Sequence, residues 1–208
     1  MKEQSLQPII EKLENLFSKA NDRFYNGELQ KPVITVSPDS TKGAYGWCTA
    51  YKAWKNIDSK DDKDGFYEIN ICSEYLTRPF EQVVGTLLHE MVHLYNLQKG
   101  IQDTSRGRKY HNKKFKEIAE QHGLHIEKDS TYGWTITTLN DEGQEFVKSF
   151  ADFKFELFRK KLPKIGKTAS KQSSRKYVCP YCGTIIRATK EVHVVCGDCD
   201  CEFEEETV

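Results

Sequence analysis

Residues 77–100 read TRPFEQVVGTLLHEMVHLYNLQKG, and this stretch decides the fold prediction. Its apolar residues recur every three or four positions, a spacing that places them on one face of an α-helix. Proline is tolerated in the first turn of a helix, so residues 77–79 mark the expected start. Lys99 and Gly100 mark the expected end, because glycine is common just after the last helical residue.

The motif His89-Glu90-Met91-Val92-His93 lies inside this helix and predicts a metal site. Histidines four residues apart lie one helical turn above one another, so two imidazoles can bind one zinc ion. Glu90 projects beside them and can act as general base toward a zinc-activated water, the nucleophile. The alternative is two surface histidines on a core helix. It is disfavoured because both histidines lie off the apolar face.

A catalytic zinc ion commonly has three protein ligands and one open position. His111, His122, His125 and several acidic residues follow the motif and are candidates for the third ligand. His111 is expected at the start of the next helix, where the preceding loop could fold it back toward the motif. His122 shares a helical face with apolar residues and is expected to be packed. His125 follows a helix-ending glycine and stays unassigned.

Five of the seven cysteines fall in the last thirty residues, which favours metal ligation over disulfide bonds. Cys179 and Cys182 form one C-x-x-C pair, and Cys196 and Cys199 form a second. Two such pairs can hold one structural zinc ion in a tetrahedral Cys₄ site. Cys201 could replace Cys199 or remain a free thiol, and Cys199 is favoured because it completes the pair.

Strands expected at residues 184–187 and 192–195 would form a hairpin between the two cysteine pairs and give a zinc ribbon. A redox role for the C-x-x-C pairs is the competing interpretation. Cys48 and Cys72 lie in strand-like segments and are expected to be small buried apolar residues.

The remaining pattern predicts an α+β fold with two folded regions. Further helices are expected at residues 6–25, 111–121 and 141–161, and strands at 33–36, 43–54, 66–71 and 132–139. Residues 1–161 would form the main domain, with helices packed on a small β-sheet. Residues 162–176 are rich in Lys, Ser, Gly and Thr and are expected to be a flexible basic linker. Residues 177–208 would form the ribbon with an acidic tail.

Charge is balanced overall, with 31 basic and 31 acidic residues, but it is unevenly distributed. Ten Lys or Arg and no acidic residue lie between Glu156 and Glu191, whereas seven acidic residues and no Lys or Arg lie from Glu191 to Val208. Another basic run spans residues 106–116 and adjoins His111. Basic segments of this kind can bind nucleic acid, or can simply be solvated.

Two stretches, LLHEMVHLYNLQKG at residues 87–100 and GRKYHNKKFKEIAEQHGL at 107–124, resemble the SprT-like zinc metallopeptidases, which are Spartan-related. The segment FYNGEL at 24–29 and Gly46-Trp47 are also similar, so the resemblance covers roughly residues 8 to 125. It implies a zincin-like metallopeptidase domain. His89, His93 and His111 would bind the catalytic zinc, and Glu90 would be the catalytic glutamate. The resemblance also favours binding of DNA.

The sequence therefore predicts a zinc-dependent endopeptidase with one catalytic and one structural Zn²⁺, acting on protein or peptide substrates associated with nucleic acid. DNA is expected to bind through the basic linker and the ribbon. The alternatives are a nucleic-acid-binding adaptor with a catalytically idle zincin-like site, and a hydrolase of non-peptide bonds. No apolar run is long enough to span a membrane, and the N-terminus lacks a signal peptide. A cytoplasmic protein without a membrane partner is expected.

Overall fold

The computed structural model describes residues 4–39, 43–61, 64–150, 153–161 and 174–206. The chain divides into two compact units, Met1–Lys161 and Leu162–Val208. Among the described residues, no helix combines the length and apolar character needed to cross a membrane.

The first unit contains a three-stranded sheet with β3 in its centre. β3 pairs in parallel with β1 and antiparallel with β2, so β2 is an edge strand. The elements of this half are α1 (Gln7–Tyr25), β1 (Val33–Ser37), β2 (Gly46–Cys48), β3 (Glu68–Cys72) and the 3₁₀ turn η1 (Ser73–Tyr75). The expected strand at residues 43–54 is wrong in extent. Only three of its residues pair with β3, and Trp54 forms an isolated bridge with Phe66.

A second sheet has the strand order β4-β5-β7-β6. Its elements are β4 (Thr104–Ser105), β5 (Tyr110–His111), β6 (Leu124–Asp129) and β7 (Gly133–Leu139), with α3 (Lys113–Gln121) between β5 and β6. The sequence predicted β7 but not β6. The expected start of α3 at His111 is also wrong. Asn112 caps the helix by accepting bonds from the amides of Lys114 and Phe115, so His111 stays in strand β5.

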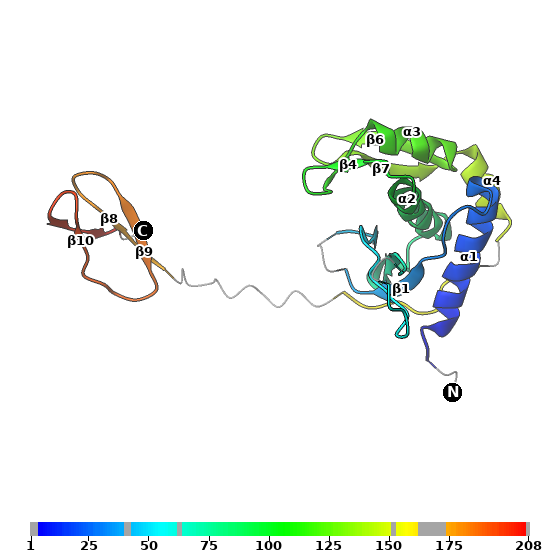
Figure 1. Cartoon of the computed structure of the whole chain (residues 1–208), viewed down its shortest axis with the longest axis horizontal. Helices are drawn as coiled ribbons and strands as arrows, with labels where there is room; N and C mark the ends of the chain where they lie inside the picture. Colours follow the sequence, from blue (N-terminus) through cyan, green and yellow to red (C-terminus); the bar gives the residue numbers. More distant parts are fainter. Residues whose placement is uncertain (1–3, 40–42, 62–63, 151–152, 162–173, 207–208) are drawn as a thin grey trace. The chain divides into compact units, whose positions relative to one another are not determined.

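Helix α2 (Phe80–Gln98) is the predicted motif helix, and it lies between the two sheets (Figure 1). It contacts β2 and β3 on one side and β6 and β7 on the other. Seven of its apolar side chains are fully buried: Val83, Val84, Leu87, Leu88, Met91, Val92 and Leu94. Burying such side chains is the main force that holds a domain together, so α2 joins both sheets into one core.

The helix expected at residues 141–161 is much shorter than predicted. Helix α4 spans Asp141–Lys148, and the Ser149 hydroxyl donates to the carbonyl of Phe146 at its end. Residues 151–152 lie outside the described part of the chain, and residues 153–161 form no helix. Phe153 and Phe155 both pack against Phe80, with ring centroids 6.0 Å apart. Side chains two residues apart share a face in an extended chain but not in a helix.

The second unit is built from short strands. They are β8 (Arg175–Val178), β9 (Ile185–Ala188), β10 (Val195–Cys196), β11 (Cys201–Glu202) and β12 (Glu204–Glu205). The predicted hairpin between residues 184–187 and 192–195 is wrong, because β9 pairs with β8 and β10 pairs with β11. The start of β8 lies within the expected linker, of which residues 162–173 are outside the described part.

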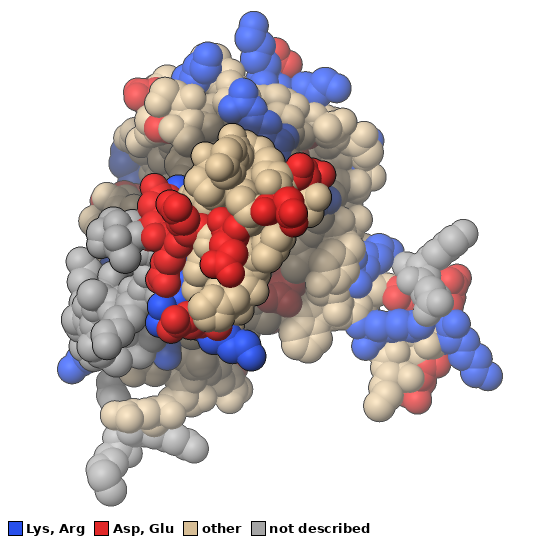
Figure 2. Space-filling view, turned by 90° about the vertical axis from the view of Figure 1, so that its left-hand side faces the viewer, with Lys and Arg blue, Asp and Glu red and all other residues tan. Residues whose placement is uncertain are grey.

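Charged side chains of both signs lie on the surface. Figure 2 shows Lys and Arg side chains in blue and Asp and Glu side chains in red. Exposed acidic residues of the second unit include Glu202, Glu204 and Glu205, and exposed basic residues of the first include Arg106 and Arg108.

We expect Gly133→Ala to destabilise the protein more than Gly107→Ala. Both glycines have positive φ, at 77° and 65°, so each substitution should cost about 1–2 kcal/mol for the left-handed backbone. A Cβ at Gly133 would in addition overlap the carbonyl oxygen of His111, whereas one at Gly107 meets nothing within 4 Å. Chemical denaturation should show a loss of more than about 2 kcal/mol for Gly133→Ala. Equal losses would contradict this close approach.

Candidate metal centres

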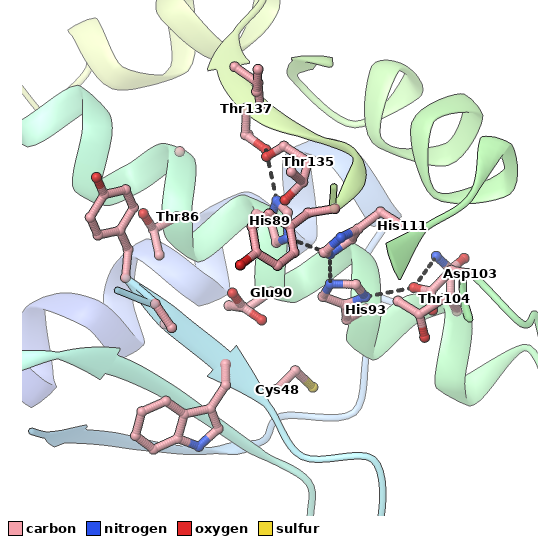
Figure 3. Close-up of a pocket in the computed structure, with 18 of the residues that line it drawn as sticks. Cys48, Thr86, His89, Glu90, His93, Asp103, Thr104, His111, Thr135 and Thr137 are labelled. Atoms are coloured by element: carbon pink, nitrogen blue, oxygen red, sulfur yellow. Dashed lines mark hydrogen bonds and ion pairs between the residues drawn. The ribbon is translucent and has the colours of Figure 1, made fainter. Parts of the chain in front are cut away.

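The structure brings His89 and His93 of α2 together with His111 of β5 (Figure 3). The Nε2 atom of His111 lies 3.3 Å from Nε2 of His89 and 3.1 Å from Nε2 of His93. In a tetrahedral zinc site with Zn–N bonds of about 2.0–2.1 Å, ligand nitrogens are roughly 3.3–3.4 Å apart. The three imidazoles therefore have the spacing of a metal-binding set.

Hydrogen bonds at the Nδ1 atoms of His89 and His93 leave the Nε2 atoms of these rings free to bind a cation. The hydroxyl of Thr137 donates to the carbonyl of Thr135, so it accepts from Nδ1 of His89 at 2.8 Å. The carboxylate of Asp103 accepts from Nδ1 of His93 at 2.7 Å. Each imidazole then presents the lone pair of Nε2 toward the centre of the cluster.

Asp103 and Thr137 contact the histidine cluster, and the sequence did not reveal either of them. Asp103 lies just before β4, is 8% exposed, and also accepts a bond from the side-chain amide of Asn96. Asn96 is itself fully buried on α2, three residues after His93. An Asp ten residues after the motif has no fixed helical relation to it, so only the fold of the loop brings the two together.

The protonation states of the three imidazoles differ. Burial, followed by the charges of the neighbouring histidines, holds the pKa of His89 well below its usual range. Burial and the charge of His93 lower the pKa of His111 to about 4. Burial also lowers the pKa of His93, but the hydrogen bond with Asp103 and the charges of Glu90 and Asp103 together outweigh it and give a net increase. Neutral His89 and His111 are the form that binds metals.

Phe115 of α3 packs against all three imidazole rings. Its ring centroid lies 4.6 Å from that of His89 and 4.7 Å from those of His93 and His111. The ring is fully buried, so it closes one side of the cluster to water. An aromatic wall of this kind limits the rotation of the imidazoles and lowers the local dielectric.

Glu90 lies beside the histidine cluster and is only 6% exposed. Burial raises the pKa of its carboxyl group to about 7, although the charge of His93 and a hydrogen bond from the backbone of Cys48 lower it. Cys48 belongs to edge strand β2, so this strand helps to position the carboxylate. A carboxyl group with a pKa near 7 can both accept and release a proton at neutral pH.

The histidines and Glu90 line a cleft of about 1980 Å³. One wall is β2, the floor includes one face of α2, and the opposite wall is β7 with the loop that carries Arg106 and Arg108. The cleft is large enough for a segment of polypeptide, since pockets for small ligands are typically about 300–1,000 Å³.

The other sequence candidates lie elsewhere or have different surroundings. His122 is buried, as expected, and stacks on Tyr25 with centroids 4.2 Å apart. His125 is exposed, with its Nε2 3.6 Å from a carboxylate oxygen of Glu127. Cys72 is fully buried, as expected, whereas Cys48 is half-buried beside the cleft.

The second unit brings four cysteines together: Cys179, Cys182, Cys196 and Cys199. The Sγ atoms of Cys182 and Cys196 are 3.7 Å apart, close to the roughly 3.8 Å expected for Zn–S bonds of about 2.3 Å. A hydrogen bond from the amide of Cys182 is the main reason that the pKa of Cys179 falls to about 6, which favours the thiolate. Cys201 is also near, with its Sγ 3.5 Å from that of Cys179. The site therefore has five thiols for four positions.

A model of the SprT-like family matches residues 13–134, which is more than half of the 208 residues. The chain belongs to the SprT-like family. This membership indicates a metallopeptidase-like domain, and the match includes all three clustered histidines and Glu90. The cysteine cluster lies beyond the match and is consistent with a zinc ribbon. No curated protein and no solved structure matches the chain.

We expect the SprT-like protein to bind two zinc ions, and Cys179→Ser/Cys182→Ser to bind one, because two thiolates cannot complete the ribbon site. Elemental analysis of purified protein measures both. One zinc ion in the wild type and none in Cys179→Ser/Cys182→Ser would mean that the histidine cluster does not retain zinc. Single variants Cys199→Ser and Cys201→Ser identify the fourth ligand, since only the ligand's removal should weaken zinc binding by the ribbon.

In the Cys179→Ser/Cys182→Ser background, Asp103→Asn should weaken zinc binding about tenfold. The introduced side-chain amide can still orient His93, but it lacks the negative charge that makes His93 a better ligand. Competition with a chromophoric chelator measures the affinity. Asp58→Asn removes an exposed carboxylate and serves as the control. An unchanged affinity in Asp103→Asn would show that the contact with His93 is not coupled to the metal.

Proposed function

We propose that the protein is a zinc-dependent endopeptidase with a zincin-like first domain and a Cys₄ zinc ribbon. The observation that carries this proposal is the convergence of imidazole lone pairs beside the buried carboxylate of Glu90. Converging acceptors repel one another unless a cation lies between them. His89, His93 and His111 would hold zinc at the first site, with Cys179, Cys182, Cys196 and Cys199 holding it at the second.

A zinc ion held by His89, His93 and His111 would supply Lewis-acid polarisation of the scissile carbonyl and a lower pKa for water. The carboxylate of Glu90 takes a proton from the attacking water and returns it to the leaving amine. The Cys48 amide orients this carboxylate. Asp103 and Thr137 hold His93 and His89 in the tautomers that face the cleft. Phe115 shields the imidazoles from bulk water.

The edge of β2 that faces away from β3 favours a polypeptide over other substrates. The Tyr45 carbonyl and the Thr49 amide bond to β3, so the backbone groups of Gly46 and Cys48 face away from it, and of these the Cys48 amide bonds to Glu90. Gly46 lies directly beside Glu90, since a Cβ there would be 3.4 Å from its Cγ. An extended peptide could pair with this edge and pass over the metal site.

Nucleic acid is the proposed partner of the basic segments. Arg106, Arg108 and Lys109 are exposed and line the same cleft as the metal site. Arg106 also lies over the ring of Tyr110, 4.8 Å from its centroid. Together with the basic linker, these residues could bind phosphates and bring nucleic-acid-associated proteins to the cleft.

We expect Glu90→Gln to retain two zinc ions and to lose hydrolysis by at least about 100-fold, because the amide cannot accept the proton. Casein digestion followed by mass spectrometry measures activity and identifies the cleaved bonds. Wild-type activity in Glu90→Gln would exclude the mechanism. Absence of hydrolysis in both proteins, with retained binding of oligonucleotides, would favour the adaptor with an idle site.

A further inference from the structure

Arg78 is a second functional group in the cleft, at the end where α2 begins. It is half-buried, and three contacts fix its guanidinium group. Nη2 donates to the hydroxyl of Thr86 at 2.8 Å, and Nε donates to the carbonyl of Tyr75 at 3.2 Å. The Cζ atom lies 4.0 Å from the ring centroid of Tyr45. The group is therefore held rigidly, which reduces the entropy lost when a ligand binds.

The charge of Arg78 has no carboxylate partner within the part of the chain that the structure describes. Neutral oxygens accept both of its hydrogen bonds there, and Nη1 makes none. Glu81 lines the same end of the cleft, but it is exposed and forms no ion pair with Arg78 among the described residues. Burial lowers the pKa of Arg78, which shows that its charge is held at a cost. An anion from outside would offset that cost.

The distance from Arg78 to the bond that would be cleaved can be estimated from α2 and β2. Its partner Thr86 precedes Glu90 by four residues on α2, which is a rise of roughly 6 Å. Gly46 lies beside both Thr86 and Glu90, because a Cβ there would lie 3.0 Å from Thr86 and 3.4 Å from Glu90. An extended chain along β2 advances about 3.3 Å per residue. The guanidinium is thus about two substrate residues from the reaction centre.

We propose that Arg78, stacked on Tyr45, is a specificity-determining residue that binds the carboxylate of an Asp or Glu side chain in the substrate, about two residues from the scissile bond. The inference rests on the proposed endopeptidase function. A guanidinium pairs with a carboxylate through two parallel hydrogen bonds, and Nη1 and the second proton of Nη2 are available for them. The half-exposed ring of Tyr45, at 48%, leaves this subsite open to the cleft.

A matched peptide series tests the subsite. A casein peptide that the protein cleaves is synthesised with Glu or Gln at each of three positions on either side of the cleaved bond. At one position about two residues away, kcat/KM should favour Glu by about tenfold, the size expected of a charged hydrogen-bonded pair. Arg78→Gln should bring this ratio to about one, and Arg78→Lys should keep part of it. Lys19→Gln removes an exposed charge on α1 and should keep the full ratio.

Other outcomes overturn the inference. A merely structural role would lower cleavage of the Glu and Gln peptides equally and leave their ratio unchanged in Arg78→Gln. No preference for Glu at any position in the wild type would also exclude the subsite. If Arg78→Gln keeps the ratio but weakens binding of a single-stranded oligonucleotide, Arg78 contacts phosphate instead.

Binding separates failure of the subsite from failure of the proposed function. If the zinc-loaded wild type cleaves no peptide, fluorescence anisotropy with labelled casein-derived Glu and Gln peptides measures their affinities directly. A preference for Glu that disappears in Arg78→Gln would support the carboxylate subsite although the peptidase proposal had failed. Equal affinities in the wild type would overturn both the subsite and its specificity role.

Discussion

The packing of helix α2 between two sheets is the constraint on which the rest of the first unit depends. Its apolar face, with Leu87, Leu88 and Met91 fully buried, fixes the rotation of the helix about its axis. Once that rotation is fixed, His89 and His93 must face the cleft one turn apart. The same contacts that stabilise the core therefore determine where the metal-binding nitrogens point, so the chemistry cannot be separated from the packing.

The second sheet supplies site residues that are distant in sequence from the motif on α2. His111 pairs with Thr104 of β4 on one side and with Gly133 on the other, where β5 meets β7 without room for a side chain on the glycine. Farther along β7, Thr137 bonds to His89 of the central helix. One strand thus positions the third imidazole and orients the first, which couples strand register to ligand geometry. A shift of β7 by one residue would turn Thr137 away from α2.

The sequence predicted the parts of the site that depend on local periodicity. The helical repeat around His89 and His93 and the paired cysteine spacing are short-range patterns, and the structure brings both sets together. Asp103 could not be predicted, because a loop rather than a repeat brings it to His93. The helix expected at residues 141–161 failed for a related reason. Its phenylalanines fit a helical repeat, but Phe153 and Phe155 reach Phe80 from a chain that is not helical. Periodicity identifies which residues are buried more reliably than it identifies the backbone that buries them.

The polar side of α2 carries side chains that are costly to bury. Glu90 and Asn96 are buried where leucine would pack at lower cost, and burial is the main cause that raises the pKa of Glu90 to about 7. Positive charge near Glu90 favours its carboxylate, and the carboxylate in turn favours cation binding at the neighbouring imidazoles. The two equilibria are linked, so any cation held by the histidines would also convert Glu90 toward its basic form. The same arrangement therefore destabilises the fold by burying Glu90 and raises the affinity of the histidine cluster for a cation. Apolar packing on the other face of α2 compensates for the cost of burying the polar groups.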